Sequence, residues 1–245
     1  MRYFLLVVLL FLGAVQLSAQ VTNIDTVDYP DPVIPISNTY NFNTDYWYTI
    51  AVRAYAYEQF PQLLNQPSGQ SYHSSYLNGL LFKINDNQIS YRFQAAHFRG
   101  DIAFDNECEG CVPQVKGKFR NTAIKIGVEK SVNYSRVQPY FGGDLGFMFQ
   151  QLNTRGFGNA TVFSEDTKNA LLFSPFVGAK VYVVPRVALG VEANFNIAYT
   201  YQKINSYTDD SFSGAPNQVR RYRWEYFFAP VAAVTVQYSF GRTNQ

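Results

Sequence analysis

Bulky apolar residues alternate with small or polar residues along several stretches of this chain. The segment VAAVTVQYSF, residues 231–240, has apolar side chains at every second position: Ala232, Val234, Val236, Tyr238 and Phe240. The same alternation runs through 119–132, 170–184 and 187–201. Successive side chains of a β-strand point to opposite faces of its sheet, so this period of two predicts strands with one apolar and one polar face.

Turn-forming residues divide the alternating stretches into hairpins. Tight turns are expected at NDN (85–87), NYSR (133–136) and PR (185–186). The strands that they join are 77–84 with 88–98, 119–132 with 137–149, and 170–184 with 187–201. Longer polar stretches, expected as loops, follow at 99–118, 150–169 and 202–220. Short turns at one end and long loops at the other are typical of outer-membrane β-barrels.

Two further segments complete the predicted sheet. A last strand covers 222–240, and YWYTIAVRAYAY, 46–57, provides a first strand that leads into a loop at 58–76. The apolar face of the first strand is expected to carry Tyr48, Ile50, Val52, Ala54 and Ala56. The count is then eight, and single-chain bacterial barrels have an even number of strands. The predicted fold class is all-β, a transmembrane antiparallel up-and-down β-barrel of eight strands over residues 45–241.

The composition favours a membrane barrel over an ordinary soluble domain. Aromatic residues make up 17% of the chain and charged residues only 16%, against about 25% charged in soluble domains. Mean hydropathy is nevertheless −0.16, as expected when lipid-facing and lumen-facing residues alternate. A secreted soluble β-sandwich is the alternative, because it has the same alternation with the apolar face turned inward.

The polar face of the predicted strands carries charges of both signs beside glycines. The charged positions are Arg53, Arg92, Lys125, Glu129, Asp144, Lys180, Glu192 and Glu225. Side chains must fill the lumen of an eight-stranded barrel, and an unpaired buried charge costs several kcal/mol. Four cations and four anions therefore predict a paired charge network inside the barrel.

The beginning of the chain indicates export. Residues 1–19, MRYFLLVVLLFLGAVQLSA, have a cation, an apolar run and small residues at the end, which is typical of a cleaved signal peptide. Residues 20–44 contain Pro30, Pro32 and Pro35 and are expected to form an extended periplasmic lead-in. The chain has 20 basic and 18 acidic residues, and this balance gives no reason to expect a nucleic-acid partner.

Three segments resemble the small outer-membrane β-barrel family of Gram-negative bacteria. They are NGLLFKINDNQISYRFQAAHF (78–98), SPFVGAKVYVVPRVALGVEANFNI (174–197) and the ending VTVQYSFG. In that family a Pro-Phe-Val-Gly strand and a short turn lead into a strand with an inward Glu, here Glu192. The resemblance implies eight strands and an outer-membrane location. It implies no shared activity, because function belongs to sites and not to folds.

Two motifs could carry chemistry. NECEGC places Cys108 and Cys111 in a predicted loop, where an exported protein is expected to form a disulfide; a metal site and a redox pair are the alternatives. His73 and Ser75 resemble the His-x-Ser pair of outer-membrane lipid A deacylases, which makes a lipid A-modifying hydrolase the alternative function. That family carries Asn where this chain has Tyr76, and no acidic partner is identifiable.

The predicted function is non-enzymatic anchoring or recognition through long extracellular loops in the bacterial outer membrane. The predicted partners are outer-membrane lipid or lipopolysaccharide and another envelope protein. Two groups of residues are candidate contacts for lipid phosphates, with plain solvation as the alternative: His97 with Arg99, and Arg220 with Arg221 and Arg223. No nucleotide-binding or metal-binding motif occurs, so no cofactor is predicted.

Overall fold

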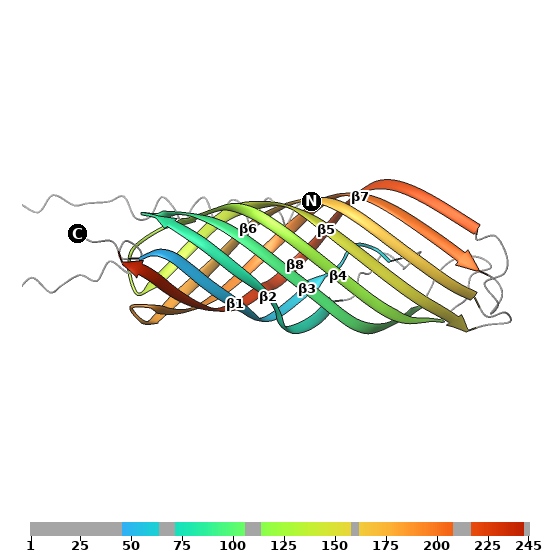
Figure 1. Ribbon diagram of the computed structural model, residues 1–245, viewed down its shortest axis with the longest axis horizontal. Helices are drawn as coiled ribbons and strands as arrows, with labels where there is room; N and C mark the ends of the chain where they lie inside the picture. The colour runs from blue at the N-terminus through green and yellow to red at the C-terminus, as the bar shows by residue number, and fades with distance from the viewer. Residues whose placement is uncertain (1–45, 64–71, 106–113, 158–161, 208–216, 243–245) are drawn as a thin grey trace, which may run out of the picture. The chain divides into compact units, whose positions relative to one another are not determined.

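The computed structural model describes residues 46–63, 72–105, 114–157, 162–207 and 217–242 (Figure 1). Eight strands are present: β1 (Tyr46–Gln59), β2 (Tyr72–Asp86), β3 (Ile89–Asp105), β4 (Gln114–Ser131), β5 (Val137–Phe157), β6 (Val162–Val184), β7 (Val187–Tyr207) and β8 (Asn217–Arg242). Each strand pairs with its neighbour in the chain, and β8 pairs with β1 to close the barrel. The predicted eight-stranded antiparallel up-and-down barrel is confirmed, and the β-sandwich is wrong as an architecture.

The barrel has two unlike ends. At the turn end, β2 and β3 are joined by Asn87 and Gln88, β4 and β5 by residues 132–136, and β6 and β7 by Pro185 and Arg186. Asn87 has a φ of 55°, a left-handed conformation that asparagine tolerates and that tight hairpin turns require. The opposite end is the loop end. Residues 1–45 lie outside the described residues, and so do the predicted signal peptide and lead-in. No helix in the described part is long and apolar enough to cross a membrane.

The strands extend farther toward the loop end than the sequence predicts. The three polar stretches 99–118, 150–169 and 202–220 were expected to be loops, but most of their residues belong to paired strands. The residues in strands are 99–105, 114–118, 150–157, 162–169, 202–207 and 217–220. The prediction of loops is therefore wrong for these residues. Backbone pairing does not depend on polar composition, and a strand that meets water on its outer face needs few apolar residues there.

The apolar side of the sheet changes from outside to inside along the same strands. Near the turn end of β4, Ile126 faces outward with 61% of its surface exposed, whereas Glu129 faces inward and is fully buried. Near the loop end of β4, Phe119 faces inward and is fully buried, and its neighbours Lys118 and Arg120 are exposed. β3, β5 and β7 show the same reversal, with Ile102, Leu152 and Ile204 buried in the loop half.

We call the outward apolar rows of the turn half the apolar belt. It includes Ile50 of β1, Leu80 of β2, Phe93 of β3, Ile126 of β4, Leu145 of β5, Val177 of β6, Val191 of β7 and Val236 of β8, all exposed. Both margins of the outer surface carry aromatic side chains. Tyr48, Tyr238 and Phe240 lie near the turn end, and Tyr222, Trp224 and Tyr226 lie toward the loop end.

The register shifts where β1 pairs with β2 and β8. The irregularity lies between Arg53 and Tyr55 in both pairings, and on β2 it coincides with Leu77, whose φ of 46° is unusual for a branched residue. A bulge of this kind changes which residues face outward. Ala56 is consequently fully buried inside the barrel, so its predicted outward position is wrong.

Candidate functional site

Six charged side chains from six strands meet inside the turn half of the barrel. They are Lys83 of β2, Arg92 of β3, Glu129 of β4, Asp144 of β5, Lys180 of β6 and Glu192 of β7, each at most 4% exposed. We call this group the interior charge network. Its three cations and three carboxylates are equal in number, so the buried group can be neutral as a whole.

Arg92 is the central cation of the interior charge network. Its Nη1 and Nη2 donate to the two carboxylate oxygens of Glu192 at 2.7 and 3.1 Å, and its Nε lies 3.2 Å from Oδ1 of Asp144. The guanidinium lies over the ring of Phe176, 4.0 Å from the ring centroid. Bidentate pairing and stacking suit an arginine and not a lysine, so this position requires the planar guanidinium.

Glu129 is the central anion of the network. Its Oε2 accepts a hydrogen bond from Nζ of Lys83 at 2.5 Å, and its Oε1 accepts one from Nζ of Lys180 at 3.1 Å. Nη1 of Arg92 lies 3.4 Å from Oε2. One carboxylate thus connects cations from three other strands across the lumen.

Two inward glycines make room for this network. A Cβ at Gly127 would collide with the Asp144 carboxylate, and a Cβ at Gly178 would collide with the ring of Tyr140. Lys83 and Lys180 lie over that ring, 5.3 and 5.6 Å from its centroid. Large inward side chains therefore pack across strand positions that have no side chain, as expected for a narrow lumen.

Two of the predicted network cations have other partners. Nζ of Lys125 donates to Ser174 Oγ at 2.9 Å and to Asn196 Oδ1 at 3.0 Å. Arg53 donates to the backbone carbonyl of Ala232, beside the irregular pairing of β8, and lies 3.9 Å from Glu58. Both side chains are buried. Arg53 supplies a hydrogen bond to a backbone group where the sheet register changes.

Glu225 belongs to a second charge cluster nearer the loop end. Its carboxylate accepts hydrogen bonds from Nζ of Lys168 at 3.0 and 3.2 Å and pairs with Arg223. Arg223 and Lys168 also donate to the backbone carbonyl of Gln62, at 3.1 and 2.5 Å. Glu225 therefore does not join the network around Arg92, and Arg223 points into the barrel.

The sequence analysis missed Lys83 and Lys168. Lys83 pairs in register with Arg92, which was identified, so the hairpin pattern already placed Lys83 on the inner face. Lys168 lies within 150–169, which was expected to be a loop, and alternation was not extended into that stretch. Lys168 has the same parity as Ser174 and Lys180, so extending the alternation of 170–184 by two residues places it on the inner face.

An apolar cluster fills the barrel beyond Glu225. The segment after β1 turns inward, so that Phe60 and Leu63 are buried against Ile102, Phe119, Leu152 and Ile204. The ring of Phe60 lies 4.8 Å from that of Phe119 and 5.0 Å from that of Phe98, measured between centroids. A hollow of about 30 Å³ lies between this cluster and Lys125.

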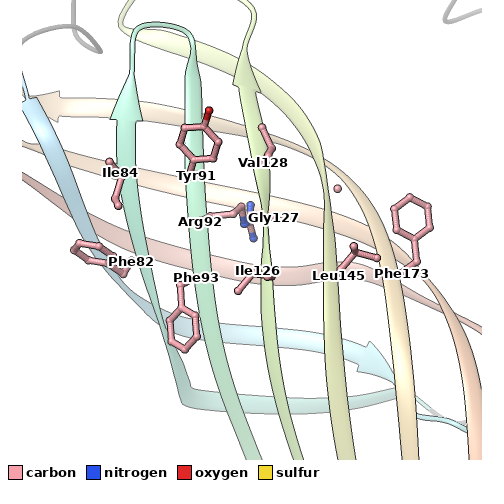
Figure 2. Close-up of a pocket in the computed structure, with 11 residues that line it drawn as sticks. Phe82, Ile84, Tyr91, Arg92, Phe93, Ile126, Gly127, Val128, Leu145 and Phe173 are labelled. Atoms are coloured by element: carbon pink, nitrogen blue, oxygen red, sulfur yellow. The ribbon is translucent and has the colours of Figure 1, made fainter.

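A shallow apolar hollow of about 580 Å³ lies on the outer surface of the apolar belt. Figure 2 shows side chains from β2 to β6 around Gly127, among them Tyr91, Ile126 and Leu145. Gly143 lines it too, and a Cβ added there would only touch Phe173, at 3.5 Å. The hollow is thus a place where the belt lacks one side chain, and its lining is mostly apolar.

His73 and Ser75 face inward on β2 but are not joined to each other. Ser75 Oγ accepts a hydrogen bond from Nδ2 of Asn78 at 2.6 Å. The His73 ring stacks on Phe60 with 5.5 Å between centroids. A serine nucleophile needs a base within hydrogen-bond reach, and this arrangement does not supply one.

We expect Ser75→Ala to leave lipid A processing unchanged in cells that produce this protein. The reason is that the hydroxyl is bonded to Asn78 and not to His73. Mass spectrometry of lipid A from cells with the wild-type chain, the variant and an empty vector measures this. A modified lipid A species that appears only with wild type would contradict the expectation and favour the hydrolase.

The remaining predicted sites divide between described and undescribed residues. Cys108 and Cys111 lie outside the described residues, so their pairing stays a prediction. His97 faces outward, as its parity predicts, and its Nδ1 lies 2.9 Å from Thr122 Oγ1. In the part of the chain that the structure describes, no group of three or more His, Cys, Asp or Glu side chains is placed to hold a metal ion.

Comparison with known proteins adds no family to this geometry. A scan against protein-family models gives no match, and a search of curated protein sequences finds no relative. Conclusions about function therefore depend on the residues and their arrangement.

Proposed function

We propose that the chain is an integral outer-membrane β-barrel that acts without catalysis, as an anchor and recognition protein presenting its loop end to the exterior. The observation that carries this proposal is the reversal of polarity along the strands. In the turn half the apolar face is outside and the charges are inside, and in the loop half the arrangement is that of a soluble barrel. A medium that is apolar around one half and aqueous around the other accounts for both.

The height of the apolar belt fits a lipid bilayer. On β5 the outward row from Val137 to Phe149 is apolar throughout. Twelve residue steps at about 3.3 Å each, tilted by about 40°, cover about 30 Å along the barrel axis. Outer-membrane barrels have an apolar band of about 25 Å with aromatic girdles at both margins. The aromatic residues at both margins of this belt support the same placement.

The loop half supports a role in recognition. β5 continues from Phe149 to Phe157, and eight residue steps raise its end by about 20 Å above the belt. The apolar cluster around Phe60 gives this projecting part its own core. A rigid platform that carries loops away from the membrane is suited to contact with another envelope component.

The filled interior argues against a pore or an internal active site as the main function. The charged groups of the lumen are engaged with one another, and the apolar cluster occupies the loop half. Eight strands enclose only enough space for side chains. The surfaces left for function are the loop end and the outer face.

We expect the mature chain to fractionate with the outer membrane of a Gram-negative host and to migrate differently in gels before and after boiling. A closed barrel resists dodecyl sulfate until heated, because its backbone hydrogen bonds have no open edge. Protease added to intact cells should cut the loop end and spare the belt. A chain that stays dissolved in buffer as a compact monomer without detergent would overturn the proposal.

A further inference from the structure

A group of cations lies on the outer face of the barrel just beyond the apolar belt. We call it the basic surface; it consists of Arg99 of β3, Lys116, Lys118 and Arg120 of β4, and Arg155 of β5, all exposed. Among the described outward side chains of these strands in the loop half, Asp101 is the one acid. The charges inside the turn half are paired with one another, whereas these five cations lie on the outer face of three neighbouring strands.

The strand register brings like charges directly opposite each other. Arg99 is the cross-strand partner of Arg120, and Lys116 is the partner of Arg155 on the other side of β4. Like charges at opposite positions destabilise a sheet. Arg99, Lys118 and Arg120 have no hydrogen bond or ion pair within the described part of the chain. Asp101 is the cross-strand partner of Lys118, so the pair that lacks an opposite charge is Arg99 with Arg120. This pair is unfavourable unless a further anion lies beside it.

The basic surface is hollowed and lies next to the belt. A hollow of about 610 Å³ is lined by Lys116, Lys118, Arg155, Asp101 and Phe163. Arg99 and Arg120 lie between this hollow and the row of His97, Thr122 and Phe149, where the belt begins. A ligand in the hollow can therefore reach the belt without crossing another charged row.

We propose that the basic surface binds the phosphate groups of a membrane lipid whose acyl chains lie along the apolar belt. This inference rests on the proposed membrane location. Arginine and lysine provide charge-assisted hydrogen bonds to phosphate, and cations at a membrane surface attract anionic headgroups. A lipid can contact the cations with its phosphates and the adjoining belt with its acyl chains, whereas free phosphate can contact only the cations. We therefore take a lipid as the occupant.

The test uses the full-length mature protein, refolded and shown by the gel shift to be a barrel. Native mass spectrometry measures binding of three probes: bisphosphorylated lipid A, the same lipid without its phosphates, and inorganic phosphate. The patch variant carries Arg99→Gln, Lys118→Gln and Arg120→Gln. The control variant carries Lys130→Gln, Arg136→Gln and Arg186→Gln, which remove the same charge at the turn end.

The patch variant is expected to bind bisphosphorylated lipid A at least about tenfold more weakly than wild type, while the control variant binds it as wild type does. Without lipid, the patch variant should unfold at the same or a higher urea concentration, because like-charge repulsion is relieved. Equal weakening in both variants, equal binding of the phosphate-free lipid, or displacement by inorganic phosphate at matching concentration would each overturn the inference. If the protein inserts into membranes but binds no lipid A, the lipid-binding role of the basic surface is refuted and the membrane proposal stands. If the protein does not insert, the membrane proposal itself is refuted.

Discussion

Glu129→Ala is expected to destabilise the barrel by about 3–5 kcal/mol, because it leaves buried cations without their shared carboxylate. Lys83, Arg92 and Lys180 all contact this one side chain. In the lumen they cannot turn to bulk water, since Glu129 and Lys83 are at most 1% exposed. Urea unfolding of the refolded protein in lipid vesicles, followed by tryptophan fluorescence, measures the loss.

Glu165→Ala is the matched control for this experiment. Glu165 is a half-buried carboxylate on β6 in the loop half, where it accepts one hydrogen bond from Gln151 at 3.3 Å. Its loss should change the unfolding free energy by no more than about 1 kcal/mol. Glu129→Gln, which keeps the size of the side chain and removes its charge, should fall between the two. Unfolding of Glu129→Ala at the urea concentration of wild type would show that the network contributes no stability.

Leu145→Arg is expected to destabilise the barrel in lipid vesicles by about 2–4 kcal/mol, the cost of an arginine facing lipid near the bilayer midplane. Leu145 faces outward from β5 with 61% of its surface exposed, close to the middle of the apolar row from Val137 to Phe149. In a soluble barrel the same replacement on an exposed position would change stability very little.

Asn153→Arg provides the comparison, because Asn153 lies on the same outward row of β5 eight residues farther on, beyond the belt. It should cost less than about 1 kcal/mol, since the added charge remains near or in water. The difference between the unfolding free energies of the two variants reports how deep each position lies in the bilayer, because both place an arginine on the same face of β5. Equal free energies of unfolding for both variants would refute the membrane location.

The sequence predicts the turn half of the barrel well because one physical signal dominates it. Strict alternation on 119–132 and 187–201 identifies strands, and turn residues identify where they reverse. The alternation also identifies the inner face, so Arg92, Glu129 and Glu192 can be assigned to one surface. Their actual partners cannot be assigned, because distances across the lumen depend on how the strands are staggered around the closed barrel.

The loop half is predicted poorly because two signals conflict there. Outward residues such as Lys118 and Arg120 are polar, and the inward apolar residues between them, such as Phe119, are few per strand. Polar composition then resembles a loop, although alternation continues with the faces exchanged. The bulge near Arg53 is a second feature that the sequence does not predict. The inserted residue turns Ala56 from the outer to the inner face, and the composition of the strand gives no sign of it.

The sequence by itself determined the class of fold, the number of strands and the side of each strand that carries charge, because these follow from local periodicity and turn chemistry. Only the tertiary structure decided which charges meet, that Glu225 pairs with Lys168 and not with Arg92, and that Arg99 faces Arg120 on the outer surface. Those contacts join residues far apart in the chain, and their positions depend on the register and closure of all eight strands together.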